Sequence, residues 1–335
     1  MKKTGENNAA KTSIVNLASK IGPLLGLLLL CVILSLATDK FFNYNNIMNI
    51  LKQASINCFI AAGMLVVLIT GGIDLSVGSN CVLAACVMGI MVEVGVTNPF
   101  LLVGAALVTG LLCGYANGLL LTRLHLPHPF VSTLGMKNVT LGLALLITAS
   151  TPIGFQNKGV DAVLALGAKT IQGFPVSFLA VVIVFVIMHV FLTRSVLGRQ
   201  IYCVGGNPEA ARLSGINSGQ VLRIVYSLSG FFSGIAAIVL IGRVSSANAT
   251  AGTTYDTDAI ASCIIGGASF MGGKGTIWGT MSGALLIAVI RNGLNLLGAQ
   301  SDIQFIVIGL VIIFAVFIDI MRIRMEERAR RLAAQ

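Results

Sequence analysis

The sequence predicts an all-α protein that crosses a membrane many times. Of its 335 residues, 56% are hydrophobic and only 10% are charged, and the mean hydropathy is +0.92. A soluble protein carries about 25% charged residues, so this chain lacks the polar surface that a soluble fold needs. Its apolar residues form long charge-free runs, which excludes a disordered chain, a disulfide-stapled secreted domain and a coiled coil.

About ten charge-free stretches are candidate membrane spans, because a spanning helix needs about 20 apolar residues. They are 21–38, 53–73, 75–92, 94–122, 138–157, 170–193, 224–242, 259–273, 275–290 and 303–318. The stretches 259–273 and 275–290 are short, so we expect their helices to extend past Asp258 or Lys274, or to be broken within the membrane. The spans predict one transmembrane domain over 21–321, between an N-terminal segment (1–20) and a basic tail (322–335).

The positions of Lys and Arg predict the orientation, since basic loops stay in the cytoplasm. With both termini in the cytoplasm, 16 of the 22 basic residues fall on the inner side and six on the outer side. The inner segments are 1–20, 121–137, 194–223, the turn at Lys274 and 322–335. The net charge of +10 therefore indicates topology and not a nucleic-acid partner. The first apolar run imitates a secretory signal, but its length favours an uncleaved helix.

Repeated glycine patterns leave two explanations open, an inverted internal repeat and plain helix packing. Gly71-Gly72 and Gly266-Gly267 each follow an apolar run, and a glycine ladder and an Asn-Gly-Leu triplet come after each pair. The ladders are Gly110, Gly114, Gly118 and Gly275, Gly279, Gly283, and the triplets are 117–119 and 292–294. Glycines four residues apart line one helix face and let a neighbouring helix approach closely.

Asp74 is the first candidate for a residue on a solute path. It stands between two apolar runs, close to Gly71-Gly72, and Ser76 follows it. An ionised carboxylate in hydrocarbon costs about 3 kcal/mol or more, so it normally faces a polar cavity or a partner. We expect Asp74 and Ser76 near the path. Capping of the next helix through the Val77 amide is a compatible alternative.

Further polar residues extend this prediction. Asn117 and Asn292 stand beside the glycine ladders and are also placed near the path, although such residues also hydrogen-bond to a neighbouring helix. The segment 245–258, SSANATAGTTYDTD, is expected to form an outer loop. Its Asp256 and Asp258 are expected to meet a partner protein or cap the following helix, and not to touch the solute.

The longest predicted inner loop, 194–223, contains a short capped helix. Asn207-Pro208 predicts a helix start with proline in the first position, Glu209 lies in the first turn, and Gly215 predicts the end. A helix of about two turns between two membrane spans suits the docking of another protein. A simple connector is the alternative.

The chain carries no pattern for catalysis, a metal or a bound cofactor. The segment 268–275, ASFMGGKG, lacks the leading Gly of a phosphate-binding loop and the Ser or Thr that should follow Lys274. His125, His128 and His189 accompany no credible nucleophile or metal set. The seven cysteines are scattered without a CxxC pair, which is typical of free packing residues.

Six motifs make the chain resemble the permease subunit of ribose- and galactose-type ABC sugar importers. They are ITGGIDLSVGS (69–79), PFVSTLG (129–135), RSVLGRQIYCVGGNPEAARLSGI (194–216), YSLSGFFSGIAAIVLIGRVSSA (226–247), YDTDAIASCIIGGASFMGGKGTIWGT (255–280) and NGLNLLG (292–298). The likeness covers about residues 20–320. The segment 124–129, LHLPHP, departs from the family pattern with its two prolines and two histidines, which leaves the subfamily open.

The resemblance implies a type II importer fold in the bacterial inner membrane, with ten helices in each of two permease subunits. The second subunit is another copy or a related chain, and a monosaccharide passes between them. A separate cytoplasmic ATPase binds ATP and magnesium, and a periplasmic sugar-binding protein delivers the substrate. The ATPase-coupling loop consists of Gly205, Gly206, Asn207, Pro208, Glu209, Ala210, Ala211 and Arg212.

Two other functional classes compete with this interpretation. A secondary transporter driven by an ion gradient is also polytopic and glycine-rich, but it usually places ionisable residues in mid-helix for coupling. A membrane-embedded enzyme needs a nucleophile, base or metal set. A capped inner loop has no obvious role in an ion-driven carrier without an ATPase, so it discriminates between that class and an ATPase-coupled permease, while the lack of a plausible catalytic set disfavours an enzyme.

Overall fold

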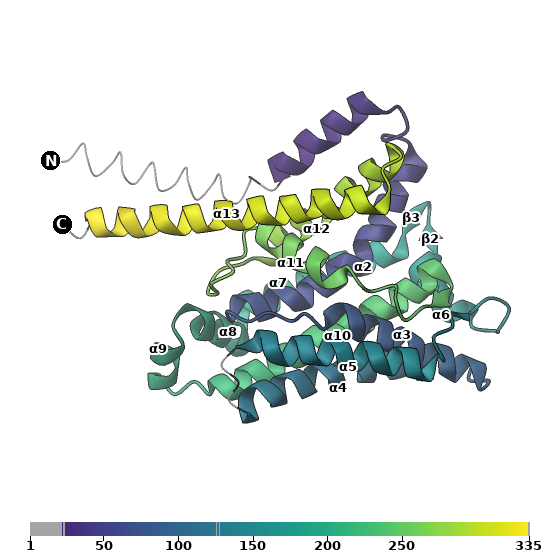
Figure 1. Ribbon diagram of the computed structural model, residues 1–335, viewed down its shortest axis with the longest axis horizontal. Helices are drawn as coiled ribbons and strands as arrows, with labels where there is room; N and C mark the ends of the chain where they lie inside the picture. Colours follow the sequence, from purple (N-terminus) through teal and green to yellow (C-terminus); the bar gives the residue numbers. More distant parts are fainter. Residues whose placement is uncertain (1–21, 23, 125, 127, 334–335) are drawn as a thin grey trace.

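The computed structural model describes residues 22, 24–124, 126 and 128–333, and it is predominantly helical (Figure 1). The predicted segment 1–20, as well as His125 and Pro127, lie outside the described residues. Seven described helices are long and apolar enough to cross a membrane. They are α2 (Tyr44–Ile69), α4 (Pro99–Arg123), α5 (Pro129–Ile147), α7 (Val176–Arg194), α10 (Ser218–Val244), α12 (Ile277–Leu296) and the part Ser301–Met321 of α13 (Ser301–Ala333).

Three other predicted spans correspond to shorter helices, so the total of ten spans stays a prediction. These are Leu24–Ala37, α3 (Val77–Glu93) and α11 (Tyr255–Ile265). Several predicted boundaries are wrong, and the starts of two helices are displaced furthest. Helix α2 begins at Tyr44 and not near 53, and α5 begins at Pro129 and not at 138, since each helix contains a lysine that the sequence pattern placed in a loop.

The remaining elements lie toward the two ends of the long helices. Figure 1 shows α8 (Val196–Gly206) and α9 (Pro208–Leu213) at one end, and α6 (Asp161–Ala168) near the other. Strand β2 (Thr170–Ile171) pairs with β3 (Phe174–Pro175) in a hairpin at the α6 end. Strand β1 (Ile153–Gly154) pairs antiparallel with β4 (Ser246–Ala247), directly after α10.

The core of the bundle is built around α2 and α10, and glycines bring α4 against α10. Gly110, Gly114 and Gly118 of α4 lie on the α10 backbone, where a Cβ added at Gly114 would overlap the carbonyl oxygen of Tyr226. Gly230 of α10 faces the Gly110 backbone in return. This is the close packing of small residues that stabilises helix pairs in membranes, so the first predicted glycine ladder is a helix interface.

Two short helices begin beside each other inside the bundle. Helix α3 follows the non-helical segment 70–76 after α2, and α11 follows the segment 245–254 after α10. The backbones of Gly78 in α3 and Gly252 before α11 are in direct contact, because a Cβ on either glycine would overlap the carbonyl oxygen of the other. The segment 245–258, which the sequence predicted as a loop on the outer side, therefore packs partly into the bundle, although Asn248, Thr250, Ala251 and Thr253 stay exposed.

The two short helices run in opposite directions from this meeting point. Helix α11 follows the direction of α2, because Ser262 contacts Asn57 and Cys263 contacts the carbonyl of Ala61. Helix α3 follows the direction of α10 and ends near β4, where Gly89 packs on Ala247. Helices α2 and α10 are antiparallel, because Gly63 packs on Ser229 whereas Ile73, just beyond α2, contacts Tyr226 earlier in α10. Helices α3 and α11 therefore diverge.

The α4–α10 interface predicts different effects for two glycines of the same helix. Gly114→Leu should destabilise the protein strongly, because overpacking a close contact costs about 1–3 kcal/mol or more. Gly104→Leu is the matched control, since no atom lies within 4 Å of a Cβ built there. Thermal unfolding of the two purified variants measures the difference. Equal melting temperatures would contradict the proposed packing role of Gly114.

Candidate functional site

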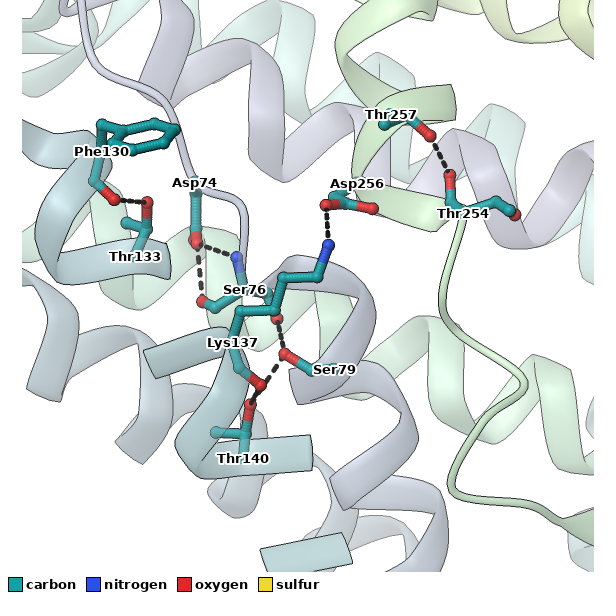
Figure 2. A network of polar contacts seen from close by, with 10 residues as sticks. All are labelled: Asp74, Ser76, Ser79, Phe130, Thr133, Lys137, Thr140, Thr254, Asp256 and Thr257. Atoms are coloured by element: carbon teal, nitrogen blue, oxygen red, sulfur yellow. Dashed lines mark hydrogen bonds and ion pairs between the residues drawn. The ribbon is translucent and has the colours of Figure 1, made fainter. Parts of the chain in front are cut away.

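Asp74, in the segment 70–76, carries a carboxylate that is completely buried (0% exposed). Its Oδ1 accepts hydrogen bonds from the amide (3.0 Å) and the hydroxyl (2.6 Å) of Ser76 (Figure 2). Its Oδ2 accepts a hydrogen bond from the Ser229 hydroxyl of α10 at 2.8 Å. The alternative of a cap on the Val77 amide is not realised, because the carboxylate binds the amide one residue earlier.

Two further side chains complete this polar cluster. The Asn117 amide of α4 donates to the Ser76 hydroxyl at 2.7 Å and lies 3.5 Å from Asp74 Oδ1. Asn80 of α3 also donates to the Ser76 hydroxyl, at 3.1 Å. Three of the four predicted path residues, Asp74, Ser76 and Asn117, thus form one network that joins α3, α4 and α10 to the segment 70–76.

Asn292, the fourth predicted path residue, lies elsewhere. Its amide and that of Asn46 exchange two hydrogen bonds, of 2.8 and 3.0 Å, between α12 and the first turn of α2. Asn292 thus hydrogen-bonds to a neighbouring helix, which is the predicted alternative for an asparagine beside a glycine ladder.

The two carboxylates in the first turn of α11 form buried ion pairs within the chain. Asp256 (2% exposed) lies 2.6 Å from the ammonium of Lys137 in α5. Asp258 (4% exposed) accepts two hydrogen bonds, of 3.0 and 2.8 Å, from the guanidinium of Arg291 in α12. Both carboxylates are paired with cations of the chain itself, which neither the predicted partner protein nor the predicted helix cap anticipated, and the second oxygen of Asp256 has no hydrogen-bond partner among the described residues. Lys137 and Arg291 likewise belong to helices and not to the loops in which the charge count placed them.

Helix α5 connects the polar groups at the starts of α3 and α11. Thr140 of α5 donates to the Ser79 hydroxyl at 2.7 Å, and Ser79 donates to the Ser76 carbonyl at 2.9 Å (Figure 2). Lys137 reaches Asp256 from the preceding turn of the same helix. Helices α3 and α11 are therefore joined through side chains of α5 as well as through the contact of Gly78 with Gly252.

The predicted coupling loop forms a capped surface helix, α9. The side chain of Asn207 accepts a hydrogen bond from the Ala210 amide at 3.0 Å, and Pro208 occupies the first helical position. Glu209 and Arg212 form a two-fold hydrogen-bonded pair, of 2.7 and 3.1 Å, that is largely exposed. The hydrogen bond from Arg212 lowers the pKa of Glu209. Leu213 is also exposed, so the helix has both charged and apolar groups on its exposed surface.

Backbone contacts join the end of α8, just before α9, to the segment that carries Asp74. A Cβ added at Gly205 would overlap the carbonyl oxygen of Ile69, the last residue of α2. The same carbonyl accepts a hydrogen bond from the Gly273 amide at 2.8 Å. Gly272, which has a φ of +86°, packs on Gly71 and Gly205. We call these contacts the glycine junction.

Sequence reasoning missed several of these partners. Ser229 and Tyr226 of α10 carried no recognisable signal, although the Tyr226 hydroxyl donates to the Ile73 carbonyl at 3.2 Å. Lys137 is separated from Asp256 by 119 positions, so no local pattern could pair them. Within the described residues, no group of three or more His, Cys, Asp or Glu could hold a metal ion.

Comparison with known proteins places this architecture in a family. Residues 46–316 match the model of the branched-chain amino acid transport system / permease component. The chain is 41% identical to the ribose import permease protein RbsC of Bacillus subtilis (strain 168), over 90% of this chain and 92% of the relative. It is 39% identical to the D-allose transport system permease protein AlsC of Escherichia coli (strain K12), over 85% and 86%. No solved structure matches.

A further relative has a different substrate in its name. The chain is 32% identical to the galactose/methyl galactoside import permease protein MglC of Escherichia coli (strain K12), over 92% of this chain and 96% of the relative. The matched region includes α3, α11, the Asp74 cluster and α9. Seven helices in the described part of the chain could cross a membrane, so the chain is a multi-pass membrane protein. It belongs to the family of permease components of ABC importers that includes the ribose, D-allose and galactose import permeases.

Proposed function

We propose that the chain is the path-forming permease subunit of an ATP-driven monosaccharide importer. The relatives that support this are named for the import of ribose, D-allose and galactose. The observation that carries the proposal is the exposed, capped helix α9, which leads through α8 and the glycine junction to the Asp74 segment. A separate ATPase would dock on α9, bind ATP and magnesium, and hydrolyse the ATP. This chain would supply the path and the mechanical link.

The proposed assembly places both termini in the cytoplasm of a bacterial cell. A single transmembrane domain covers 21–321, with cytoplasmic segments at 1–20 and 322–335, and ten helices per subunit include the three short ones. A second permease copy or a related chain completes the path, and a periplasmic sugar-binding protein delivers the substrate. The seven long helices and the placement of α9 at one end of the bundle are consistent with this arrangement (Figure 1).

We further propose that the chain contains an inverted repeat centred on α2 and α10. In each half a long helix is followed by a non-helical segment, a short helix and another long helix, as α2–α3–α4 and α10–α11–α12. The opposite directions of α3 and α11 support a two-fold relation in the membrane plane, and an Asn-Gly-Leu triplet occurs in both α4 and α12.

In this mechanism the Asp74 cluster maintains the shape of the path. The Asp74 carboxylate accepts every hydrogen bond that Ser76 and Ser229 offer it, so its role is to hold the segment 70–76 rather than to bind sugar directly. When the ATPase subunits close, the movement of α9 would reach this segment through the glycine junction. Alternating access would then follow from rearrangement of the two halves.

Glu209→Lys tests the coupling role of α9. We expect sugar uptake to fall by about two- to fivefold, because a basic residue in the first turn opposes the helix dipole by about 0.3–1 kcal/mol and changes the docking face. The amount of folded protein should change little, since the pair with Arg212 is exposed. Lys158→Glu, an equal charge reversal before α6, is the control. Copurification of the ATPase and uptake in vesicles are measured. Normal uptake in Glu209→Lys would refute the coupling assignment.

Cysteine labelling tests the orientation. In a Cys203→Ser background, a cysteine introduced by Ser214→Cys should react with an impermeant maleimide only from the cytoplasmic side. One introduced by Thr250→Cys should react only from the outside, because both positions are exposed and lie on opposite sides in the proposed topology. Reversed accessibility in right-side-out and inside-out vesicles would exclude this orientation.

Ser229→Ala tests the structural role of Asp74. The change leaves a buried carboxylate oxygen without its donor, which costs about 1–3 kcal/mol. We expect the melting temperature and the uptake rate to fall together. Ser227→Ala is the control on the same helix, since that hydroxyl donates only to the Arg223 carbonyl one turn earlier. An unchanged melting temperature with lost uptake would instead indicate direct contact between Asp74 and the sugar.

A further inference from the structure

The non-helical segment between α10 and α11 runs along α3 at the depth of the membrane. Ala247, in β4, packs on Gly89 near the end of α3, and Gly252 packs on Gly78 near its beginning. These two glycines of α3 are 11 positions apart, so the segment follows the helix for about 16 Å at a rise of about 1.5 Å per residue. The hydrocarbon core of a bilayer is about 30 Å thick, so the segment covers about half of that depth.

The polar residues of this segment are exposed on the surface of the single chain. They are Asn248, Thr250 and Thr253, and the exposed Thr257 follows in the first turn of α11. Lipid offers no hydrogen bonds, so non-helical backbone at membrane depth is tolerated only where protein covers it or where it lines a water-filled cavity. The exposed side of this segment therefore faces another protein chain or water, and not hydrocarbon.

Helix α5 exposes a polar residue at the same depth. Asn138 is the tenth of the 19 residues of α5, it is exposed, and its side chain forms no hydrogen bond with a described residue. Thr140, two residues further along the helix, is hydrogen-bonded to Ser79, the neighbour of Gly78 in α3. Asn138 thus lies near the level that the segment reaches at Gly252. Polar side chains in the middle of a membrane helix normally face the bundle interior or a water-filled cavity.

An ion pair joins these two exposed parts of the chain. Lys137 reaches from α5 to Asp256 at the start of α11, where Thr257 is the next residue (Figure 2). The Lys137 side chain remains 31% exposed. Charged groups in hydrocarbon are costly and normally face a water-filled cavity or a partner. The partly exposed ion pair favours water over a dry contact with another chain, because removal of the remaining water would add a desolvation cost.

We call these exposed residues the polar face, which consists of Lys137, Asn138, Asn248, Thr250, Thr253 and Thr257. Apart from Lys137, whose charge is balanced by Asp256, they carry neutral amides and hydroxyls. Such groups both donate and accept hydrogen bonds, so they can exchange partners with water and with the hydroxyl groups of a sugar. Ion-conducting paths are lined by charged side chains or by rings of carbonyl oxygens. The chemistry of the polar face therefore suits a neutral polyhydroxylated solute.

We propose that the polar face lines the aqueous path of a neutral sugar, and that a second permease subunit closes this path on the opposite side. The inference rests on the proposed import function and identifies the wall along which the sugar moves. That wall consists of α5 and the segment 248–257, and not of the Asp74 cluster, whose side chains are buried within one chain. In the proposed topology β4 lies at the outer end, so the segment leads from the outer surface toward the middle of the membrane.

Reaction of introduced cysteines with a water-soluble thiol reagent tests the polar face. In the full-length chain with Cys203→Ser, Asn138→Cys and Thr257→Cys each place a thiol on the face. Ile183→Cys, near the middle of α7, is the matched control, because Ile183 is 61% exposed on an apolar helix. Each variant is assembled with the ATPase and the binding protein in membrane vesicles, and a charged methanethiosulfonate is added on both sides during ATP turnover. The rate of the Cys203→Ser parent is subtracted.

Both cysteines on the polar face should react at least about tenfold faster than Ile183→Cys. The thiolate is the reacting species, and each unit by which hydrocarbon raises the pKa of a thiol lowers the thiolate fraction about tenfold. Rates no faster than that of Ile183→Cys would overturn the proposal, because they would indicate that lipid or a dry protein contact covers the face.

Uptake of D-ribose, D-allose and D-galactose, measured before and after modification, shows whether the sugar uses this path. Modification should remove most of the uptake by Asn138→Cys and Thr257→Cys and leave the uptake by Ile183→Cys unchanged. Rapid reaction without loss of uptake would overturn the proposal. Uptake by variants whose cysteines do not react would refute the polar face alone. A Cys203→Ser parent that transports none of the three sugars would instead count against the import function, and against the inference with it.

Discussion

The constraint on which this structure depends is that backbone polar groups inside a membrane must find partners within the protein. Helices α3 and α11 begin in the interior of the bundle, and the segments 70–76 and 245–254 that precede them are not helical. The backbone amides and carbonyls of these segments therefore need partners other than helical hydrogen bonds. The first is held by the Asp74 carboxylate, which binds the Ser76 amide, and by the Tyr226 hydroxyl, which binds the Ile73 carbonyl. The direct contact of Gly78 and Gly252 then excludes side chains and water from the point where the segments meet.

The buried carboxylates at the starts of α3 and α11 have different kinds of partner. At α3 a single carboxylate is surrounded by neutral hydroxyl and amide donors, whereas at α11 each carboxylate has its own cation. A buried ion pair contributes little net stability, but removal of one partner leaves an uncompensated charge and costs about 3–5 kcal/mol. The pairs Asp256–Lys137 and Asp258–Arg291 therefore specify where α5 and α12 lie relative to α11 more than they strengthen the fold.

The sequence predicts the membrane class and the capped helix α9, and it singles out Asp74, Ser76 and Asn117 without predicting that they form one cluster, because single residues and local patterns are visible in a sequence and contacts between distant segments are not. An acidic residue within an apolar run or a proline after asparagine is visible without a structure. The sequence predicts that the segment 245–254 is not helical, but not that it packs on Gly78, since a polar stretch that enters a bundle has the composition of one that stays outside. The predicted starts of α2 and α5 are wrong because Lys52 and Lys137, which bound charge-free stretches of the sequence, lie within these helices. The polar face combines α5 with the segment 248–257, and no linear pattern connects these two distant parts of the chain.

The glycine junction affects how force can pass through the molecule. Most helix contacts involve side chains, which change rotamer and absorb small displacements before the backbone moves. At Gly205, Gly272 and Gly273 main chain touches main chain, and a hydrogen bond to the Ile69 carbonyl closes the contact. No side chain separates Gly205 from the Ile69 carbonyl, so a displacement of the end of α8 acts on the end of α2 without first being taken up by rotamer changes.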